Sequence, residues 1–172
     1  MAITSDSLSR TRLDSKPVPR DMVVLLDRYQ AQLAKLGIFI SDDPNVAPWA
    51  DESYLTEADL ANPDIAANVR AMRDTNRLIY FIGFADNGES FGIWRKVSSE
   101  DLNCCPPVTL DTEGQYEVYR SWAECFRMLL SDEPICDQIE NDTGVFSETS
   151  IEPNEYRNDK YELYLSQEET GS

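Results

Sequence analysis

The chain contains no histidine, and its 15 basic residues are outnumbered by 32 acidic ones. Without histidine, the commonest general base, nucleophile activator and metal ligand are all missing. The net charge of −17 repels phosphate backbones and anionic membranes, and it favours basic macromolecules. These absences favour a protein that binds another protein over an enzyme. We expect no cofactor, no metal, no nucleic acid and no membrane among its ligands.

Long apolar runs are also missing. No stretch approaches the roughly 20 apolar residues that span a bilayer, and residues 1–19 contain no apolar block of a secretory signal. The four cysteines lack C-x-x-C spacing, which predicts reduced and mostly buried thiols rather than a zinc site; they are Cys104, Cys105, Cys125 and Cys136. Together these features predict a cytoplasmic protein.

Composition divides the chain into three parts. Residues 1–16 are rich in Ser, Thr, Arg and Asp, and we expect a flexible arm there. Residues 17–131 carry the apolar periodicity of a folded domain. Residues 132–172 hold two basic and twelve acidic residues, which predicts an acidic, partly ordered extension with a late strand or short helix at 161–165.

Three helices are predicted from periodicity and start signals. The first has apolar residues at steps of three and four between residues 22 and 36, and Gly37 ends it. The second begins at the capping residue Asn62, followed by Pro63. The third begins at Ser121, which forms an S-x-x-E capping box with Glu124.

Two hairpins are predicted between the second and third helices. Residues 79–84 and 91–94 flank Asn87-Gly88, which supplies the positive φ angles of a tight turn. Residues 108–110 and 116–119 flank a second acidic turn that contains Gly114. Residues 38–55 are expected to be irregular. The order of elements predicts an α+β domain, with helices packed on an antiparallel sheet of about four to six strands.

Three segments resemble the SUKH superfamily, whose members include bacterial toxin-immunity proteins and eukaryotic cell-wall assembly regulators. They are the proline-acid-apolar opening at 17–26, the hydrophobic hairpin with its acidic glycine turn at 79–94, and the closing strands with their Ser-aromatic-acid-Phe-Leu helix at 107–129. The resemblance implies an α+β fold and an intracellular binding role, in many bacterial members the neutralisation of a cognate toxin, often a nuclease. It carries over neither catalytic residues nor specific contacts.

The candidate partner-binding residues combine aromatic and acidic side chains in a proline-bounded loop and a hairpin turn. Trp and Tyr are frequent interface hot spots, and carboxylates complement a basic partner. The candidates are Trp49, Asp51, Glu52, Tyr54, Asp86 and Glu89. An alternative is that the two aromatic residues only anchor the loop on the core. Turn geometry alone also accounts for residues 87–88.

The sequence therefore predicts a non-catalytic immunity protein, a monomer or weak dimer, that binds and neutralises a basic toxin domain. Two alternatives stay open. One is a regulatory or scaffold module of the same fold, and the other is an acidic mimic of nucleic acid. Adjacent acids such as Asp42-Asp43 are expected to be solvated charge rather than a magnesium or acid–base site.

Overall fold

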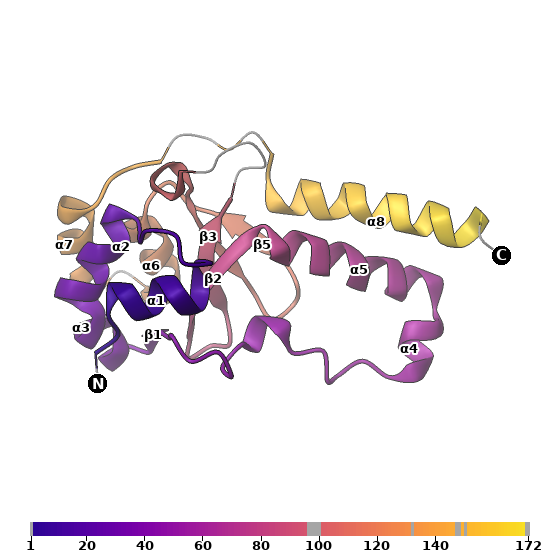
Figure 1. The fold of residues 1–172 in the computed structure, drawn as a ribbon, viewed down its shortest axis with the longest axis horizontal. Helices are drawn as coiled ribbons and strands as arrows, with labels where there is room; N and C mark the ends of the chain where they lie inside the picture. Colours follow the sequence, from indigo (N-terminus) through magenta and orange to yellow (C-terminus); the bar gives the residue numbers. More distant parts are fainter. Residues whose placement is uncertain (1, 96–100, 132, 147–148, 150, 171–172) are drawn as a thin grey trace.

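The computed structural model describes residues 2–95, 101–131, 133–146, 149 and 151–170 of the 172-residue chain (Figure 1). These residues form an α+β fold around one five-stranded sheet, as the sequence predicts. The strands follow one another across the sheet in chain order, and each pairs antiparallel with the next. They are β1 (Ile38–Ile40), β2 (Ile79–Ala85), β3 (Ser90–Trp94), β4 (Pro107–Leu110) and β5 (Tyr116–Val118).

The sheet separates two hydrophobic clusters, because successive side chains of a strand point to opposite faces. On β2, Tyr80 and Ile82 belong to the larger cluster, whereas Ile79 and Phe81 belong to the smaller one. β2 is buried at six of its seven positions. Its continuous apolar run is therefore explained by burial on both faces.

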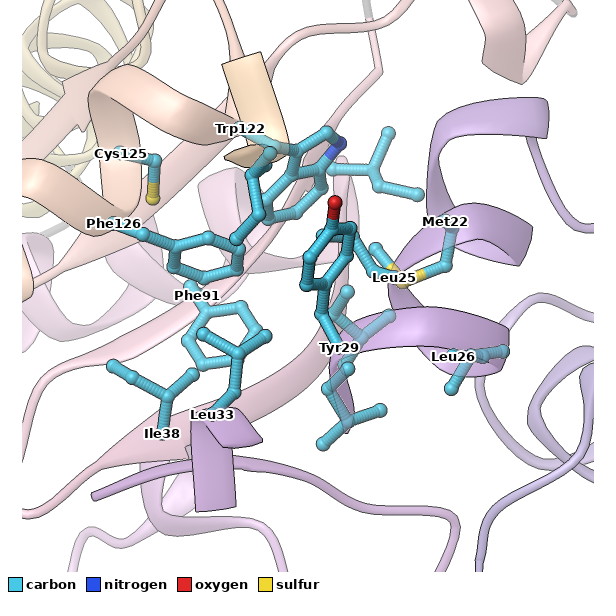
Figure 2. Packing of buried hydrophobic residues seen from close by; sticks show 14 of the residues in the cluster. Met22, Leu25, Leu26, Tyr29, Leu33, Ile38, Phe91, Trp122, Cys125 and Phe126 are labelled. Carbon is cyan, nitrogen blue, oxygen red and sulfur yellow. The ribbon is translucent and has the colours of Figure 1, made fainter. Parts of the chain in front are cut away.

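Helices from both ends of the domain cover the larger cluster. They are α1 (Ser5–Arg12), the continuous segment α2 (Arg20–Val24), η1 (Leu25–Tyr29) and α3 (Gln30–Lys35), and then α6 (Trp122–Leu130) and α7 (Ile135–Asp142). Figure 2 shows Phe91 of β3 between the N-terminal helices and α6. Its ring meets those of Trp122 and Phe126 edge-on, at centroid distances of 6.2 and 5.7 Å. Such edge contacts add to the stabilisation that burial provides.

Two longer helices and a loop cover the smaller cluster. α5 (Pro63–Arg77) follows the short helix α4 (Glu57–Ala61), and α8 (Pro153–Thr170) lies beside α5 in Figure 1. The loop after β1 contains the 3-10 turn η2 (Pro48–Ala50) and brings Trp49 onto this face. A further 3-10 turn, η3 (Leu102–Cys104), precedes β4. None of the described helices is both long and apolar enough to cross a membrane.

The predicted helix starts are confirmed. The Asn62 side chain accepts a hydrogen bond from the Asp64 amide at 2.9 Å, and Ser121 accepts one from the Glu124 amide at 3.0 Å. The Glu124 carboxylate accepts from the amide of Arg120 at 2.8 Å instead of from that of Ser121. Gly37 follows the first predicted helix with a φ of 91°, where a side chain would be strained.

The structure differs from the prediction at the N-terminus. Residues 5–12, expected within a flexible arm, form α1, which begins with a capping box between Thr4 and Ser7. Leu8 and Leu13 are fully buried in the larger cluster. The sequence did not indicate this helix, because all residues of α1 except Leu8 are partly or fully exposed and the segment is mostly polar.

Two further segments are more regular than predicted. Residues 38–40, placed in an irregular stretch, form β1, since they pair with residues 83–85 of β2. The C-terminal extension at 132–172 contains α7 and the 18-residue α8 in place of a late strand or short helix. Residues 132, 147–148, 150 and 171–172 of that extension lie outside the described part of the chain.

The first hairpin pairs as predicted, but its turn differs. Gly88 has a φ of 92°, whereas Asn87 does not have a positive φ. The Ala85 amide donates to the carbonyl oxygen of Glu89 at 2.8 Å, which closes a longer turn than the one expected. Asn87 contributes through its side chain, whose oxygen accepts a hydrogen bond from the Glu89 amide at 2.9 Å.

Candidate functional site

The two hairpin turns lie together at one end of the sheet. In an antiparallel sheet whose strands follow chain order, the β2–β3 and β4–β5 turns emerge at the same end. A Cβ atom on Gly88 would stand 2.9 Å from Cγ2 of Thr112, so the turns are in contact. A Cβ atom on Gly114 would likewise stand 3.4 Å from Cε of Met72 on α5. The topology thus places both turns against α5.

A groove of about 430 Å³ lies between these turns, α5 and the loop at 48–54. We call it the acidic groove. Its lining includes three carboxylates, two aromatic rings and two aliphatic side chains, contributed by Trp49, Asp51, Tyr54, Met72, Leu110, Asp111 and Glu113. Neither lysine nor arginine occurs among the described residues that line it. The groove is therefore apolar and aromatic in part, and its charge is entirely negative.

Trp49 fixes the loop onto the sheet. Its ring stacks on that of Phe81 at a centroid distance of 4.9 Å and an interplanar angle of 12°. The Arg12 guanidinium carbon lies 4.9 Å from the Trp49 centroid. Arg12 also donates to the carbonyl oxygens of Ser41 and Val46, at 2.9 and 2.7 Å. This packing favours the alternative in which Trp49 anchors its loop on the core.

Tyr54 is placed differently from Trp49, although both belong to the same loop. Its side chain is 70% exposed and stands at the rim of the acidic groove. Asp51, also exposed, accepts a hydrogen bond from the Ser53 amide at 2.9 Å, and bonding to Ser53 holds the pKa of Asp51 below its usual value. The loop thus presents one exposed aromatic ring and one ionised carboxylate at the groove.

The second hairpin contributes two more acids. One oxygen of Asp111, Oδ1, accepts hydrogen bonds from the amides of Glu113 and Gln115, at 2.9 and 2.8 Å. These bonds hold the Asp111 carboxylate in a fixed orientation. Burial, and then the charge of Asp111, raise the pKa of nearby Glu89. Negative charge is therefore concentrated at this end of the sheet.

A second pocket of about 380 Å³ also has Trp49 in its lining, and its charge is mainly positive. Arg12, Arg73 and Arg77 line it together with Glu52. The Glu52 carboxylate accepts two hydrogen bonds from Arg73, at 3.0 and 2.5 Å, and this pairing lowers the pKa of Glu52. Glu52 thus ties the loop to α5 and does not line the acidic groove.

The six predicted partner-binding residues are therefore only partly brought together. Trp49, Asp51 and Tyr54 line the acidic groove, and Glu89 lies beside it. Asp86 is exposed next to Gly37, where its amide donates to the Gly37 carbonyl oxygen at 2.9 Å. Sequence reasoning missed the acidic pair Asp111 and Glu113 and the side chain of Met72. The acid-rich turn at 111–114 was visible in the sequence, but its position beside the loop depends on the sheet topology.

Comparison of the chain with protein-family models, with curated proteins and with solved structures finds no match. The resemblance to the SUKH superfamily thus rests on the three segments at 17–26, 79–94 and 107–129. The groove and its chemistry are the basis for a functional proposal.

Proposed function

We propose that the chain is a non-catalytic immunity protein that neutralises a basic toxin domain, with the acidic groove at the centre of its binding surface. The observation that carries this proposal is the convergence of three carboxylates and an exposed tyrosine in one groove without a cationic side chain among its lining residues. Aromatic anchors beside charges that match the partner are typical of protein interfaces.

Long-range electrostatics support a basic partner. A net charge of −17 accelerates association with a positively charged protein and disfavours neutral or acidic competitors. Toxins that cleave nucleic acid need positive charge to hold phosphates. An acidic protein that covers such a surface competes directly with the substrate.

The loop at 48–54 is held in place before any partner arrives. The stack of Trp49 on Phe81 and the ion pair of Glu52 with Arg73 fix it at two points. A preformed loop loses little conformational entropy on binding, which favours affinity. The sequence signals and this geometry together support binding by surface complementarity.

The strongest burial effects on pKa values lie away from the groove. Burial raises the pKa values of Tyr116, Tyr119 and Cys125, all of which belong to the two hydrophobic clusters. None of these three lines the acidic groove. Groups tuned for proton transfer are expected to converge in the cleft that holds a substrate. The groups whose pKa values burial raises most thus belong to the hydrophobic clusters and not to the acidic groove.

Co-expression tests the proposal. The open reading frame adjacent to the gene is expressed with and without this chain, and survival of the host is scored. We expect a toxic neighbour, rescue by this chain, and a complex that survives gel filtration. A neighbour without toxicity that also forms no complex would contradict the immunity role and favour the regulatory or scaffold alternative.

A matched pair of variants tests the surface. Asp51→Asn, Asp111→Asn and Glu113→Gln together are expected to abolish rescue while the protein stays folded. The control carries Glu155→Gln, Asp159→Asn and Glu162→Gln on the exposed side of α8, which changes the net charge equally. Equal loss of rescue by both variants would show that overall charge, and not the groove, carries the function.

A further inference from the structure

We propose that the acidic groove binds the side chain of an arginine that a partner protein presents on its surface. This inference rests on the proposed protein-binding function and names the chemistry that the groove recognises. Its carboxylates come from two separate segments, the loop at 48–54 and the β4–β5 turn, and both line the same 430 Å³ space. Ligand pockets typically begin at about 300 Å³, so the groove has room for a single long side chain.

The carboxylates have unused acceptor capacity. Both turn bonds to Asp111 use Oδ1, and no described residue donates a hydrogen bond to its Oδ2 or to the carboxylate of Glu113. A guanidinium group carries five N–H donors in a planar arrangement that matches carboxylates. One arginine can therefore satisfy several of these acceptors at once. The internal bonds of Asp111 keep its second oxygen oriented before the ligand arrives.

The apolar part of the groove suits the rest of an arginine side chain. Met72 and Leu110 line it and provide contacts for three methylene groups. Phe81 and Arg12 already contact the ring of Trp49, whereas the ring of Tyr54 is largely exposed. Tyr54 is thus the ring onto which an incoming guanidinium can stack. A lysine ammonium is more strongly hydrated and neither stacks nor binds in a bidentate manner, so arginine is favoured.

An NMR titration of the full chain tests this inference without a partner protein. The probe is Nα-acetyl-arginine amide at low ionic strength, and the matched control is Nα-acetyl-citrulline amide, which has nearly the same shape but no charge. We expect saturable shifts at Tyr54, Met72, Gly88 and Gly114, and at least tenfold weaker binding of the citrulline compound. Equal responses to both compounds would overturn the inference. Equal affinity for Nα-acetyl-lysine amide would overturn the preference for arginine.

Two variants locate the binding site. Asp111→Asn with Glu113→Gln is expected to weaken arginine amide binding at least tenfold, since the asparagine oxygen retains the turn bonds. Asp159→Asn with Glu162→Gln on α8 changes the net charge equally and is expected to leave affinity unchanged. Equal weakening by both pairs would place the effect in overall charge and overturn the groove as the site. Arginine binding without rescue from a toxin would uphold this inference while contradicting the immunity role.

Discussion

The two faces of the sheet are covered in different ways. Among the described residues, the larger cluster contains 24 buried residues, which come from helices at both ends of the domain and from strands of the sheet, whereas the smaller one contains six. On the smaller face, α8 buries only Pro153 among its first 15 residues. The larger face thus holds most of the hydrophobic core, and the candidate groove lies on the face with less of it.

Hydrogen bonds position α8 on the smaller face, where few of its described residues are buried. The Asn154 side chain both accepts from the Tyr116 amide and donates to the Tyr116 carbonyl oxygen, at 3.0 and 2.7 Å, along the open edge of β5. Tyr161 and Tyr164 donate to Asp64 and Asp74 of α5. Polar contacts of this kind fix position more than they add stability. Substitutions on the two faces are therefore expected to differ in their cost to the free energy of unfolding.

The largest effect is expected on the larger face. Phe126 is fully buried beside Phe91, so Phe126→Ala is expected to lower the free energy of unfolding by about 3–5 kcal/mol. Urea unfolding followed by circular dichroism measures this loss. Phe126→Leu retains most of the volume and is expected to cost much less. A loss below 1 kcal/mol for the alanine variant would contradict the assignment of the main core to this face.

A smaller loss in the free energy of unfolding is expected for a substitution at the acidic groove. Trp49→Ala removes the stack on Phe81 but leaves a partly exposed site, so we expect a loss of about 2 kcal/mol. Hydrogen exchange should quicken in the loop at 48–54 and stay unchanged in α6. Trp49→Phe keeps an aromatic ring at this position and is expected to retain part of the stack. An equal increase of the exchange rate in the loop at 48–54 and in α6 would contradict the expectation that the two faces of the sheet are destabilised independently.

The edge of β5 is expected to respond more weakly. Asn154→Ala removes both side-chain hydrogen bonds to Tyr116, at a cost of about 1 kcal/mol, because water replaces part of the contact. Amide exchange should rise in α8 and at residues 116–118. Asn158→Ala on the same helix is the control, since Asn158 is exposed and contacts no strand through a hydrogen bond among the described residues. Matching effects from both variants would contradict the role of Asn154 as an edge clamp.

The smallest expected effect is a gain in the free energy of unfolding, whereas the three preceding substitutions lower it. Burial raises the pKa of Glu89 above its value in the unfolded chain, so ionised Glu89 destabilises the fold above its folded-state pKa. Glu89→Gln should therefore stabilise the protein at pH 7, by less than about 1 kcal/mol because solvent screens this partly exposed group. This difference should shrink as the pH falls below about 4.3, where glutamate is protonated in both states. Thermal unfolding from pH 3 to 8 measures it, and a less stable variant at pH 7 would contradict the expected sign.

Local signals predicted several elements well. The hairpin of β2 and β3 follows from its apolar strands, which are buried on both faces, and from the turn glycine Gly88, although Asn87 lacks the expected positive φ. The helix α6 follows from Ser121 and from apolar spacing, and it packs four buried residues into the core. Local signals failed where tertiary packing decided the outcome. The helix α1 is mostly polar, and α8 has no apolar stripe on one face, so neither shows the periodicity from which helices are predicted.

The candidate site also contains residues that the sequence predicts and residues that only the fold brings to it. Trp49, Asp51 and Tyr54 were found from residue type, because aromatic and acidic side chains in a proline-bounded loop are typical of interfaces. The second acidic segment, at Asp111 and Glu113, could not be assigned to the same site. About sixty residues separate it from the loop, and only the strand order brings the two together.

The sequence by itself determined the charge of the protein, the absence of histidine chemistry, the α+β class and the segments that form hairpins. Each depends on composition or on neighbours a few residues apart. The tertiary structure alone decided which acids share a groove and that Glu52 is withdrawn from it by Arg73. It also decided that Trp49 is an anchor while Tyr54 stays exposed. The physical reason is that burial and electrostatic coupling depend on distances in space, which chain folding sets and local sequence patterns do not contain.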